Sequence, residues 1–296
     1  MSNNNAAAAS FAEADHTPTN RLAARDLVVG YDERIIINGL DIDVPDAAVT
    51  TIIGPNGCGK STLLRCLARL LPPKSGTVFL DGADITTIKP KTVARTLGIL
   101  PQNPVAPEGL TVADLVARGR HPYQKWYQQA SADDEAAVAE ALELTSTTEL
   151  ADRSINALSG GQRQRVWIAL ALAQGTDLLL LDEPTTYLDL AHSLEVLDLV
   201  HSLKTDHGKT IVMVLHDLNL AVRYSDSLFV MADGALVTQG TPDEVITTQL
   251  LDSAFGLRAE VVADPVFGGP MIVPIGTHSA RALQDDRAGQ PHRRGE

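Results

Sequence analysis

The stretch GPNGCGKST, from Gly54 to Thr62, decides the fold of this chain. It lies between an apolar run that ends at Ile53 and a segment in which leucines recur at helical spacing, beginning with Leu63 and Leu64. The pattern G-x-x-x-x-G-K-[ST] in this context is typical of a P-loop, where a strand runs through a glycine-rich turn into a helix. The stretch therefore predicts a site for a nucleoside triphosphate.

Each part of this turn has an expected chemical task. Backbone N–H groups of the turn and of the helix N-terminus can point at a polyphosphate. Lys60 would place a positive charge beside the β- and γ-phosphates, and the Ser61 hydroxyl is an expected Mg²⁺ ligand. A chance glycine-rich turn is the alternative, but the required strand and helix are both indicated. The expected nucleotide-binding residues are Gly54, Pro55, Asn56, Gly57, Cys58, Gly59, Lys60, Ser61 and Thr62.

Composition limits the classes of protein to which the chain can belong. The 296 residues carry a net charge of −13, with 24 basic and 37 acidic side chains, which argues against nucleic acid as the main partner. The only cysteines, Cys58 and Cys66, suit no disulfide framework, so we expect a reducing compartment. No apolar run approaches the roughly 18–20 residues of a membrane span.

The chain divides into a central domain and two polar ends. Residues 1–20 lack the basic start of a signal peptide and are expected to be a disordered leader, and residues 278–296 a disordered tail. Strand and helix signals alternate over residues 21–277, which predicts an α/β fold with a helix-covered parallel sheet. The expected strands lie at residues 26–29, 48–53, 77–80, 97–100, 177–181, 210–215, 228–231 and 235–237.

Helices are expected at residues 60–71 and 190–203, and a third begins at the capping box that starts with Thr241. From 111 to 150 the pattern is helical without a convincing strand, so a helical insert of about residues 105–165 is predicted within the α/β domain.

A second motif, LLLLDEPTTYLD, spans residues 178–189. Four consecutive leucines predict a strand buried on both faces, and it ends in Asp182 and Glu183. Beside a P-loop, the first carboxylate would reach Mg²⁺ and the second could polarise a water molecule for attack on the γ-phosphorus. A solvated Asp-Glu pair is the alternative, which the upstream P-loop makes minor.

A third motif, LSGGQRQR, runs from Leu158 to Arg165 before an apolar helix. Ser159 is a natural N-cap, and Gly160 and Gly161 leave the first N–H groups of that helix open to an anion. One γ-phosphate is already held by the P-loop, which suggests that this second element serves the nucleotide of another molecule. An ordinary capped helix is the alternative.

With these motifs in order, the chain resembles the nucleotide-binding domains of ABC ATPases from about Arg21 to Thr277. The resemblance implies a P-loop NTPase core of the RecA type with an antiparallel β subdomain and a helical insert. It also implies that LSGGQRQR contacts ATP on the opposite subunit of a head-to-tail dimer. The trans-acting residues would be Ser159, Gly160, Gly161 and Gln162 of this signature and Asp189 of the D-loop.

The resemblance also assigns roles around the γ-phosphate. Glu183 and His216 would be catalytic, and Gln102 would be both a catalytic sensor and a Mg²⁺ ligand beside Ser61 and Asp182. Tyr31 resembles the aromatic residue that stacks on adenine, although on spacing alone it would be an ordinary tyrosine. One departure is Ala47, where relatives usually have glycine; it affects a turn and not the site.

Finer likeness points to a transport motor. With one P-loop and no long coiled-coil segment, the chain does not resemble the translation or DNA-repair classes of the family. LPQNPVAPEGLTVADLVARGRHPYQ, DEPTTYLDLAHSLEVLDLV and FGLRAEVVADPVFGGPMIVPIG resemble the ATPases of ferric-siderophore importers. The implied partners are separate permease subunits, a second copy of the chain and, indirectly, an extracytoplasmic binding protein, with the chain at the cytoplasmic face of the membrane. Importers of heme or cobalamin, and a soluble ATPase without a transport role, stay open.

The aromatic segment HPYQKWYQQ, with Tyr123, Trp126 and Tyr127, has two possible roles. Its rings could dock on a permease, or they could pack within the helical insert.

Overall fold

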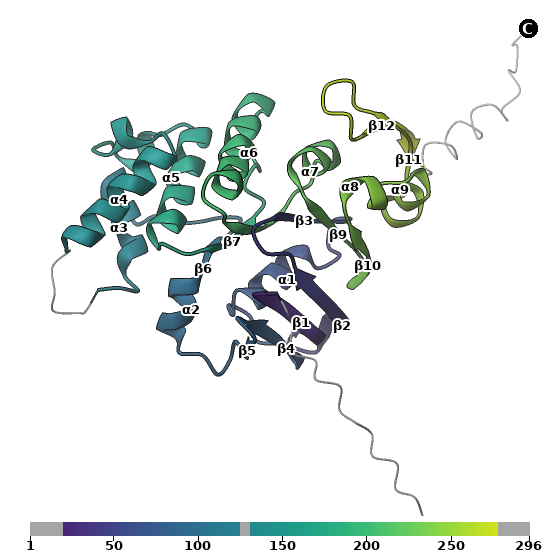
Figure 1. The fold of residues 1–296 in the computed structure, drawn as a ribbon, viewed down its shortest axis with the longest axis horizontal. Helices are drawn as coiled ribbons and strands as arrows, with labels where there is room; N and C mark the ends of the chain where they lie inside the picture. The colour runs from purple at the N-terminus through teal and green to yellow at the C-terminus, as the bar shows by residue number, and fades with distance from the viewer. Residues whose placement is uncertain (1–19, 125–130, 278–296) are drawn as a thin grey trace, which may run out of the picture.

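The computed structural model describes residues 20–124 and 131–277, so nearly all of the expected leader and the whole expected tail lie outside the described residues. The P-loop strand lies inside a six-stranded sheet of order β10-β9-β3-β8-β7-β6 (Figure 1). Its pairs are parallel, except that β10 runs antiparallel to β9. The strands are β3 (Val49–Ile53), β6 (Leu97–Leu100), β7 (Leu178–Asp182), β8 (Thr210–Val214), β9 (Ser227–Ala232) and β10 (Ala235–Gly240).

This sheet is covered on both faces, as its continuous apolar strands predict. Every residue of β3, β7 and β8 is buried. Leu179 and Leu181 of β7 pack into a core with the helices of one face, whereas Leu178 and Leu180 pack into a second core on the other face. The helices around the sheet are α1 (Lys60–Leu67), α2 (Pro90–Thr96), α5 (Gly160–Ala173), α6 (Leu190–Thr205), α7 (Leu218–Tyr224), α8 (Pro242–Val245) and α9 (Thr248–Phe255).

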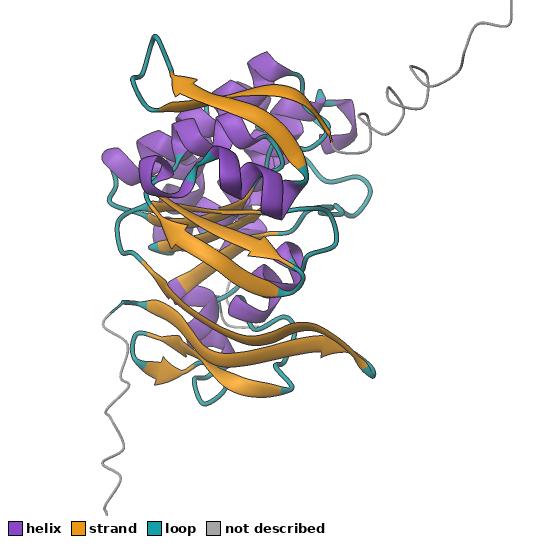
Figure 2. Cartoon of the chain, turned by 90° about the vertical axis from the view of Figure 1, so that its right-hand side faces the viewer, coloured by secondary structure: helices purple, strands orange, loops and turns teal. Residues whose placement is uncertain are grey.

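The second core includes an antiparallel sheet of order β2-β1-β4-β5. Figure 2 shows this sheet below the central sheet. Its strands are β1 (Leu22–Tyr31), β2 (Arg34–Val44), β4 (Ser75–Leu80) and β5 (Ala83–Asp84). The chain passes from β2 into the P-loop strand β3 through a turn in which Ala47 has a φ of 50°.

The helical insert contains α3 (Val112–Ala117) and α4 (Ala132–Leu144), with short 3₁₀ turns and one isolated bridge between Thr111 and Ser154. Its interior holds a charged pair: Arg120 Nε donates to Asp134 Oδ1 over 2.9 Å, and Arg120 Nη1 donates to Ala173 O over 2.7 Å. The Arg120 guanidinium also stacks on the Tyr123 ring at 3.9 Å. Tyr123 thus packs within the insert, whereas Trp126 and Tyr127 lie outside the described residues.

The structure corrects two expectations and adds elements that were not predicted. The helix expected over residues 60–71 ends at Leu67, because Arg69 takes a left-handed conformation with a φ of 58° before Pro72 and Pro73. The strand expected over residues 26–29 extends from Leu22 to Tyr31. Unpredicted elements are β2, β5, α2, α7, α9 and the C-terminal hairpin of β11 (Leu257–Ala263) and β12 (Pro270–Thr277).

Figure 1 shows this hairpin and the helical insert at opposite ends of the central sheet. In the part of the chain that the structure describes, no helix is both long enough and apolar enough to cross a membrane.

Candidate active site

The P-loop turn takes backbone conformations that require glycine. Gly54, Gly57 and Gly59 have φ angles of 156°, 79° and 107°. A Cβ on Gly54 would lie 2.1 Å from Met231 O, so no larger residue fits there. The turn ends in the N-terminus of α1, where Gly59 is the N-cap and no side chain caps the helix. Its first N–H groups therefore remain available to an anion.

Lys60 is held over this turn rather than extended into solvent. Its Nζ donates to Gly54 O and Pro55 O, each over 2.9 Å, and the residue is only 5% exposed. A cation fixed at the mouth of the turn can exchange these carbonyl oxygens for phosphate oxygens at little cost in side-chain entropy.

Asp182 and Ser61 meet beside the turn, from strand β7 and helix α1. Ser61 Oγ donates to Asp182 Oδ1 over 2.8 Å. Burial raises the pKa of Asp182, and the negative charge of Glu183 adds to that rise, against the lowering effect of the Ser61 bond. Asp182 Oδ2 is buried and has no hydrogen-bond partner among residues 20–124 and 131–277. A buried carboxylate oxygen without a partner, next to a hydroxyl oxygen, is a donor set that fits Mg²⁺.

Glu183 lies at the centre of a hydrogen-bonded group. His216 Nε2 is 2.6 Å from Glu183 Oε1, and Thr186 Oγ1 donates to Glu183 Oε2 over 2.8 Å. Burial acts to raise the pKa of Glu183, but hydrogen bonds from His216, Thr186 and Gln102 outweigh it and hold the pKa below its ordinary value. The carboxylate is 8% exposed and its residue has a φ of 55°. Because its pKa is low, the carboxylate of Glu183 is ionised at neutral pH. Its hydrogen bonds to His216 and Thr186 fix its orientation.

A cavity of about 490 Å³ joins these parts. Its size suits a nucleotide-sized ligand. Tyr31, which is 43% exposed, lies on the wall of the cavity, as expected for a residue that stacks on adenine. The sequence did not predict Arg34 and Ile36 as lining residues, nor the hydrogen bond from Thr186 to Glu183. Arg34 follows Tyr31 across the tight β1–β2 turn, a proximity that only the hairpin reveals. The lining residues are Tyr31, Arg34, Ile36, Asn56, Gly57, Gly59, Lys60, Ser61, Thr62, Glu183 and His216.

The signature residues lie at the start of helix α5, next to the start of α6, and not in the cavity beside the P-loop. Ser159 Oγ accepts from Gln162 N over 3.3 Å, and Gln162 Oε1 accepts from Ser159 N over 3.1 Å, which forms a capping box at the start of α5. Asp189 Oδ1 caps α6 by accepting from His192 N over 2.9 Å. Of the described residues, none from the signature lines the cavity beside the P-loop.

Gly160 and Gly161 differ in the space around them. A Cβ on Gly161 would lie 2.5 Å from His192 Cδ2, whereas a Cβ on Gly160 would make ordinary contacts with Leu188 Cδ2 at 3.5 Å and Tyr187 O at 4.0 Å. The signature and the D-loop are thus packed together, with Gly160 on the open side.

Comparison with known proteins identifies the family. A family model described as ABC transporter matches residues 37–186. The achromobactin transport ATP-binding protein of Dickeya dadantii is 53% identical over 255 residues, covering 86% of this chain and 95% of that protein. The ferric enterobactin transport ATP-binding protein of Escherichia coli is 48% identical over 256 residues, covering 86% and 94%.

Solved structures agree with this likeness. A bacterial ABC transporter cassette solved as a dimer superposes with a TM-score of 0.65 at 27% identity, over 74% of this chain and 98% of that chain. Together with the geometry of the P-loop cavity, the extent of these matches means that the chain belongs to the ABC transporter family.

Proposed function

We propose that the chain is the ATP-hydrolysing subunit of an importer of ferric siderophores and that it works as a head-to-tail dimer on separate permease subunits. The observation that carries the hydrolytic role is the orientation of Glu183, whose two oxygens are held by His216 and Thr186 beside the P-loop. Relatives of about half-identical sequence that serve achromobactin and ferric enterobactin transport support the cargo class.

Hydrolysis at this site needs a water molecule in line with the γ-phosphate. Glu183 would orient that water and take its proton as the new oxygen–phosphorus bond forms and the bond to the β-phosphate oxygen breaks. His216 keeps the carboxylate aimed, and Lys60 neutralises charge on the phosphate oxygens. Ser61, Asp182 and Gln102 would hold Mg²⁺, which when bound supplies further charge neutralisation between the phosphates.

The second half of the site would come from another copy of the chain. Ser159, Gly160, Gly161 and Gln162, with Asp189 nearby, would meet the nucleotide bound to the opposite P-loop. The absence of signature residues from the described lining of the P-loop cavity and the dimeric cassette of similar fold support this arrangement. ATP binding would close the dimer and hydrolysis would reopen it, a motion passed to the permease at the cytoplasmic face of the membrane.

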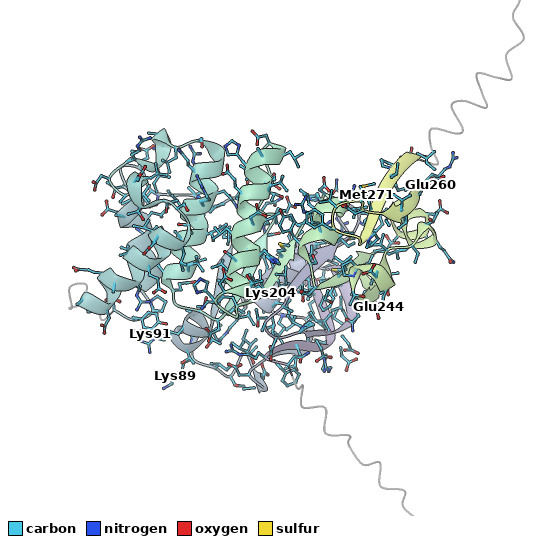
Figure 3. The ribbon with its side chains drawn as sticks, turned by 45° about the horizontal axis from the view of Figure 1, so that its top comes forward. Lys89, Lys91, Lys204, Glu244, Glu260 and Met271 are labelled. Carbon is cyan, nitrogen blue, oxygen red and sulfur yellow. The ribbon has the colours of Figure 1, made fainter. Side chains whose placement is uncertain are left out.

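The first prediction tests the catalytic role. Glu183→Gln preserves the shape of the side chain but removes its basicity, so we expect ATP turnover to fall by ~10²–10⁴-fold while ATP binding persists. Phosphate release and a fluorescent-nucleotide titration measure the two properties. Glu260→Gln makes the same chemical change on the hairpin, remote from the cavity (Figure 3), and should leave both unchanged. Turnover of Glu183→Gln within about threefold of the native protein would exclude the proposed role.

The cargo is tested by transport. Cells that lack this chain should fail to accumulate ⁵⁵Fe supplied as a ferric siderophore, and the native chain, but not Glu183→Gln, should restore uptake. Restored uptake of cobalamin or heme, with no change in siderophore iron, would instead favour those cargos.

A further inference from the structure

We infer that the C-terminal hairpin β11–β12 fixes the position of His216, and that Asn219 transmits this constraint as a positioning residue for hydrolysis. The inference rests on the proposed function, because it assigns to His216 the task of aiming Glu183. None of the motifs in the sequence marks Asn219 or the hairpin for such a role.

Asn219 joins the first turn of α7 to the hairpin by two hydrogen bonds. Its Nδ2 donates to Ile272 O over 3.1 Å, and its Oδ1 accepts from Ile272 N over 2.8 Å. Ile272 is 4% exposed, so its backbone is a firm anchor although Asn219 itself lies at the surface. Because both bonds join the planar amide of Asn219 to the backbone of a single residue, they restrain the position and the rotation of the first turn of α7.

His216 is directly linked to this turn. It lies one residue before Asp217, the N-cap of α7, whose side chain accepts from Leu220 N over 2.9 Å. The chain on the other side of His216 leaves strand β8 at Val214 in the buried central sheet. A displacement of the first turn of α7 therefore has to be absorbed in the short segment that carries His216.

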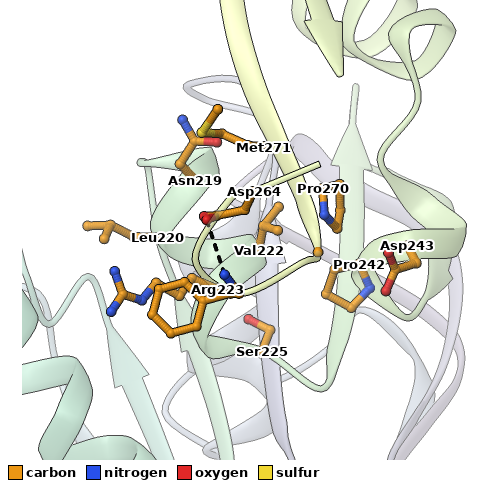
Figure 4. A pocket seen from close by; sticks show the side chains of 12 residues that line it. Asn219, Leu220, Val222, Arg223, Ser225, Pro242, Asp243, Asp264, Pro270 and Met271 are labelled. Atoms are coloured by element: carbon orange, nitrogen blue, oxygen red, sulfur yellow. Dashed lines mark hydrogen bonds between the residues drawn. The ribbon is translucent and has the colours of Figure 1, made fainter. Parts of the chain in front are cut away.

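The rest of the contact between α7 and the hairpin is mainly apolar: Ala221 and Val222 share one buried core with Ile272. At the other end of the helix, the Arg223 guanidinium lies 3.8 Å from the centre of the Phe267 ring. A cavity of about 350 Å³ lies between α7, α8 and the hairpin, with Asn219 beside Met271 on its wall (Figure 4). Apolar contacts hold the two elements together but have no preferred direction, so the orientation of the first turn depends on the two hydrogen bonds of Asn219.

The experiment compares three variants of the full-length protein. Asn219→Ala removes both bonds to Ile272 and should lower kcat for ATP by about tenfold, since a small misplacement of a catalytic group is costly. KM for ATP should stay within about twofold, because no P-loop contact changes. Asn219→Asp keeps the acceptor for Ile272 N and should lose less activity. Arg223→Ala removes the contact at the far end of α7 and should leave kcat within about twofold.

A double-mutant cycle separates positioning from a general loss of structure. In a His216→Gln background, measured in single turnovers, Asn219→Ala should cause no further loss, because the two changes act on the same step. The His216 ring nitrogen signals, assigned by comparison with His216→Gln, should shift in Asn219→Ala and not in Arg223→Ala.

Three outcomes would overturn the inference. The fold-losses in kcat of His216→Gln and Asn219→Ala could multiply in the double variant, the His216 ring signals could stay in place in Asn219→Ala, or Asn219→Ala and Arg223→Ala could lose equal activity. These outcomes are distinct from failure of the proposed function. If Glu183→Gln retained turnover, the proposed function would fail; if Glu183→Gln were inactive and Asn219→Ala normal, only the role of the hairpin would fail.

Discussion

Two of the residues with a left-handed backbone conformation lie in the segment that carries the candidate catalytic carboxylate. Glu183 and Tyr187 are non-glycine residues with φ angles of 55° and 66° in one short segment. Each such residue costs of order 1–3 kcal/mol unless its surroundings hold it in place. For Glu183 the surroundings are the bonds to His216 and Thr186, which fix the direction of the carboxylate.

The hydroxyl of Thr186 provides a prediction about pH. Because its bond helps to lower the pKa of Glu183, Thr186→Val should raise that pKa. On the proposed mechanism, activity requires the ionised carboxylate and is lost as pH falls through its pKa, so the acid limb of the kcat–pH profile should move to higher pH. Thr185→Val makes the same change one residue away and serves as the control. An acid limb that stays in place in Thr186→Val would contradict the assignment.

Asp182 provides a prediction about stability. Burial raises the pKa of this carboxyl, so the folded protein disfavours its charged form and stability falls as pH rises through the folded pKa. Asp182→Asn removes the buried charge and should raise Tm without nucleotide at pH 8, with a smaller gain at acid pH. It should also remove the further rise in Tm that Mg²⁺ and ATP give the native protein. Thermal denaturation with and without Mg²⁺ and ATP measures both effects; an unchanged ligand-dependent rise would exclude Asp182 from the metal site.

Among the secondary-structure elements, the helices differ in whether a side chain caps the N-terminus. Helices α5, α6 and α7 begin with side-chain caps from Ser159, Asp189 and Asp217. Helix α1 begins at Gly59 without one, so its N–H groups are left for phosphate. Nucleotide binding would supply partners for these N–H groups of the P-loop helix.

The turn between β2 and β3 yields a prediction about folding stability. Ala47 has a φ of 50°, a conformation that glycine adopts without steric cost. Ala47→Gly should raise the free energy of unfolding by about 0.5–1 kcal/mol, measured by urea denaturation. Ala139→Gly, at an exposed site within α4, should lower it by a similar amount. Destabilisation by both substitutions would show that the Ala47 conformation carries no strain.

For the whole molecule, the proposed dimer accounts for the separation of two motifs. Among the described residues, the P-loop cavity is lined without any residue of the signature at the start of α5. On the proposed head-to-tail arrangement, a second copy would bring the signature of one chain to the P-loop of the other.

Mixed dimers test this arrangement. Lys60→Ala damages the P-loop, and Gly160→Asp places a carboxylate where the partner's phosphate would approach. A Cβ on Gly160 would make only ordinary van der Waals contacts, so the second change should not disturb folding, unlike a change at Gly161. Mixing the two variants gives heterodimers with one intact composite site, so ATPase activity should exceed that of either variant alone. No gain on mixing, with heterodimers verified by mass spectrometry, would contradict a site shared between subunits.

Local sequence pattern was enough to predict several parts of the candidate site. The P-loop, the buried strand that ends at Asp182 and the cap at Ser159 follow from glycine positions, apolar runs and capping residues read over a few neighbours. The likeness of these motifs to ABC ATPases extended that reading to Gln102 and His216. The ionised state and aim of Glu183 could not be read in this way, because they depend on His216 and Thr186 meeting the carboxylate in space.

The contact of the hairpin with α7 required the folded structure. The hairpin segment resembles importer ATPases in sequence, but the Pro274 and Gly276 of β12 give no clear strand pattern, and Asn219 is an ordinary polar residue on a short helix. Their meeting depends on the docking of a C-terminal hairpin against α7, a contact between positions distant in the chain. Side-chain packing across such distances is selected by the whole core at once, which is why local periodicity cannot predict it.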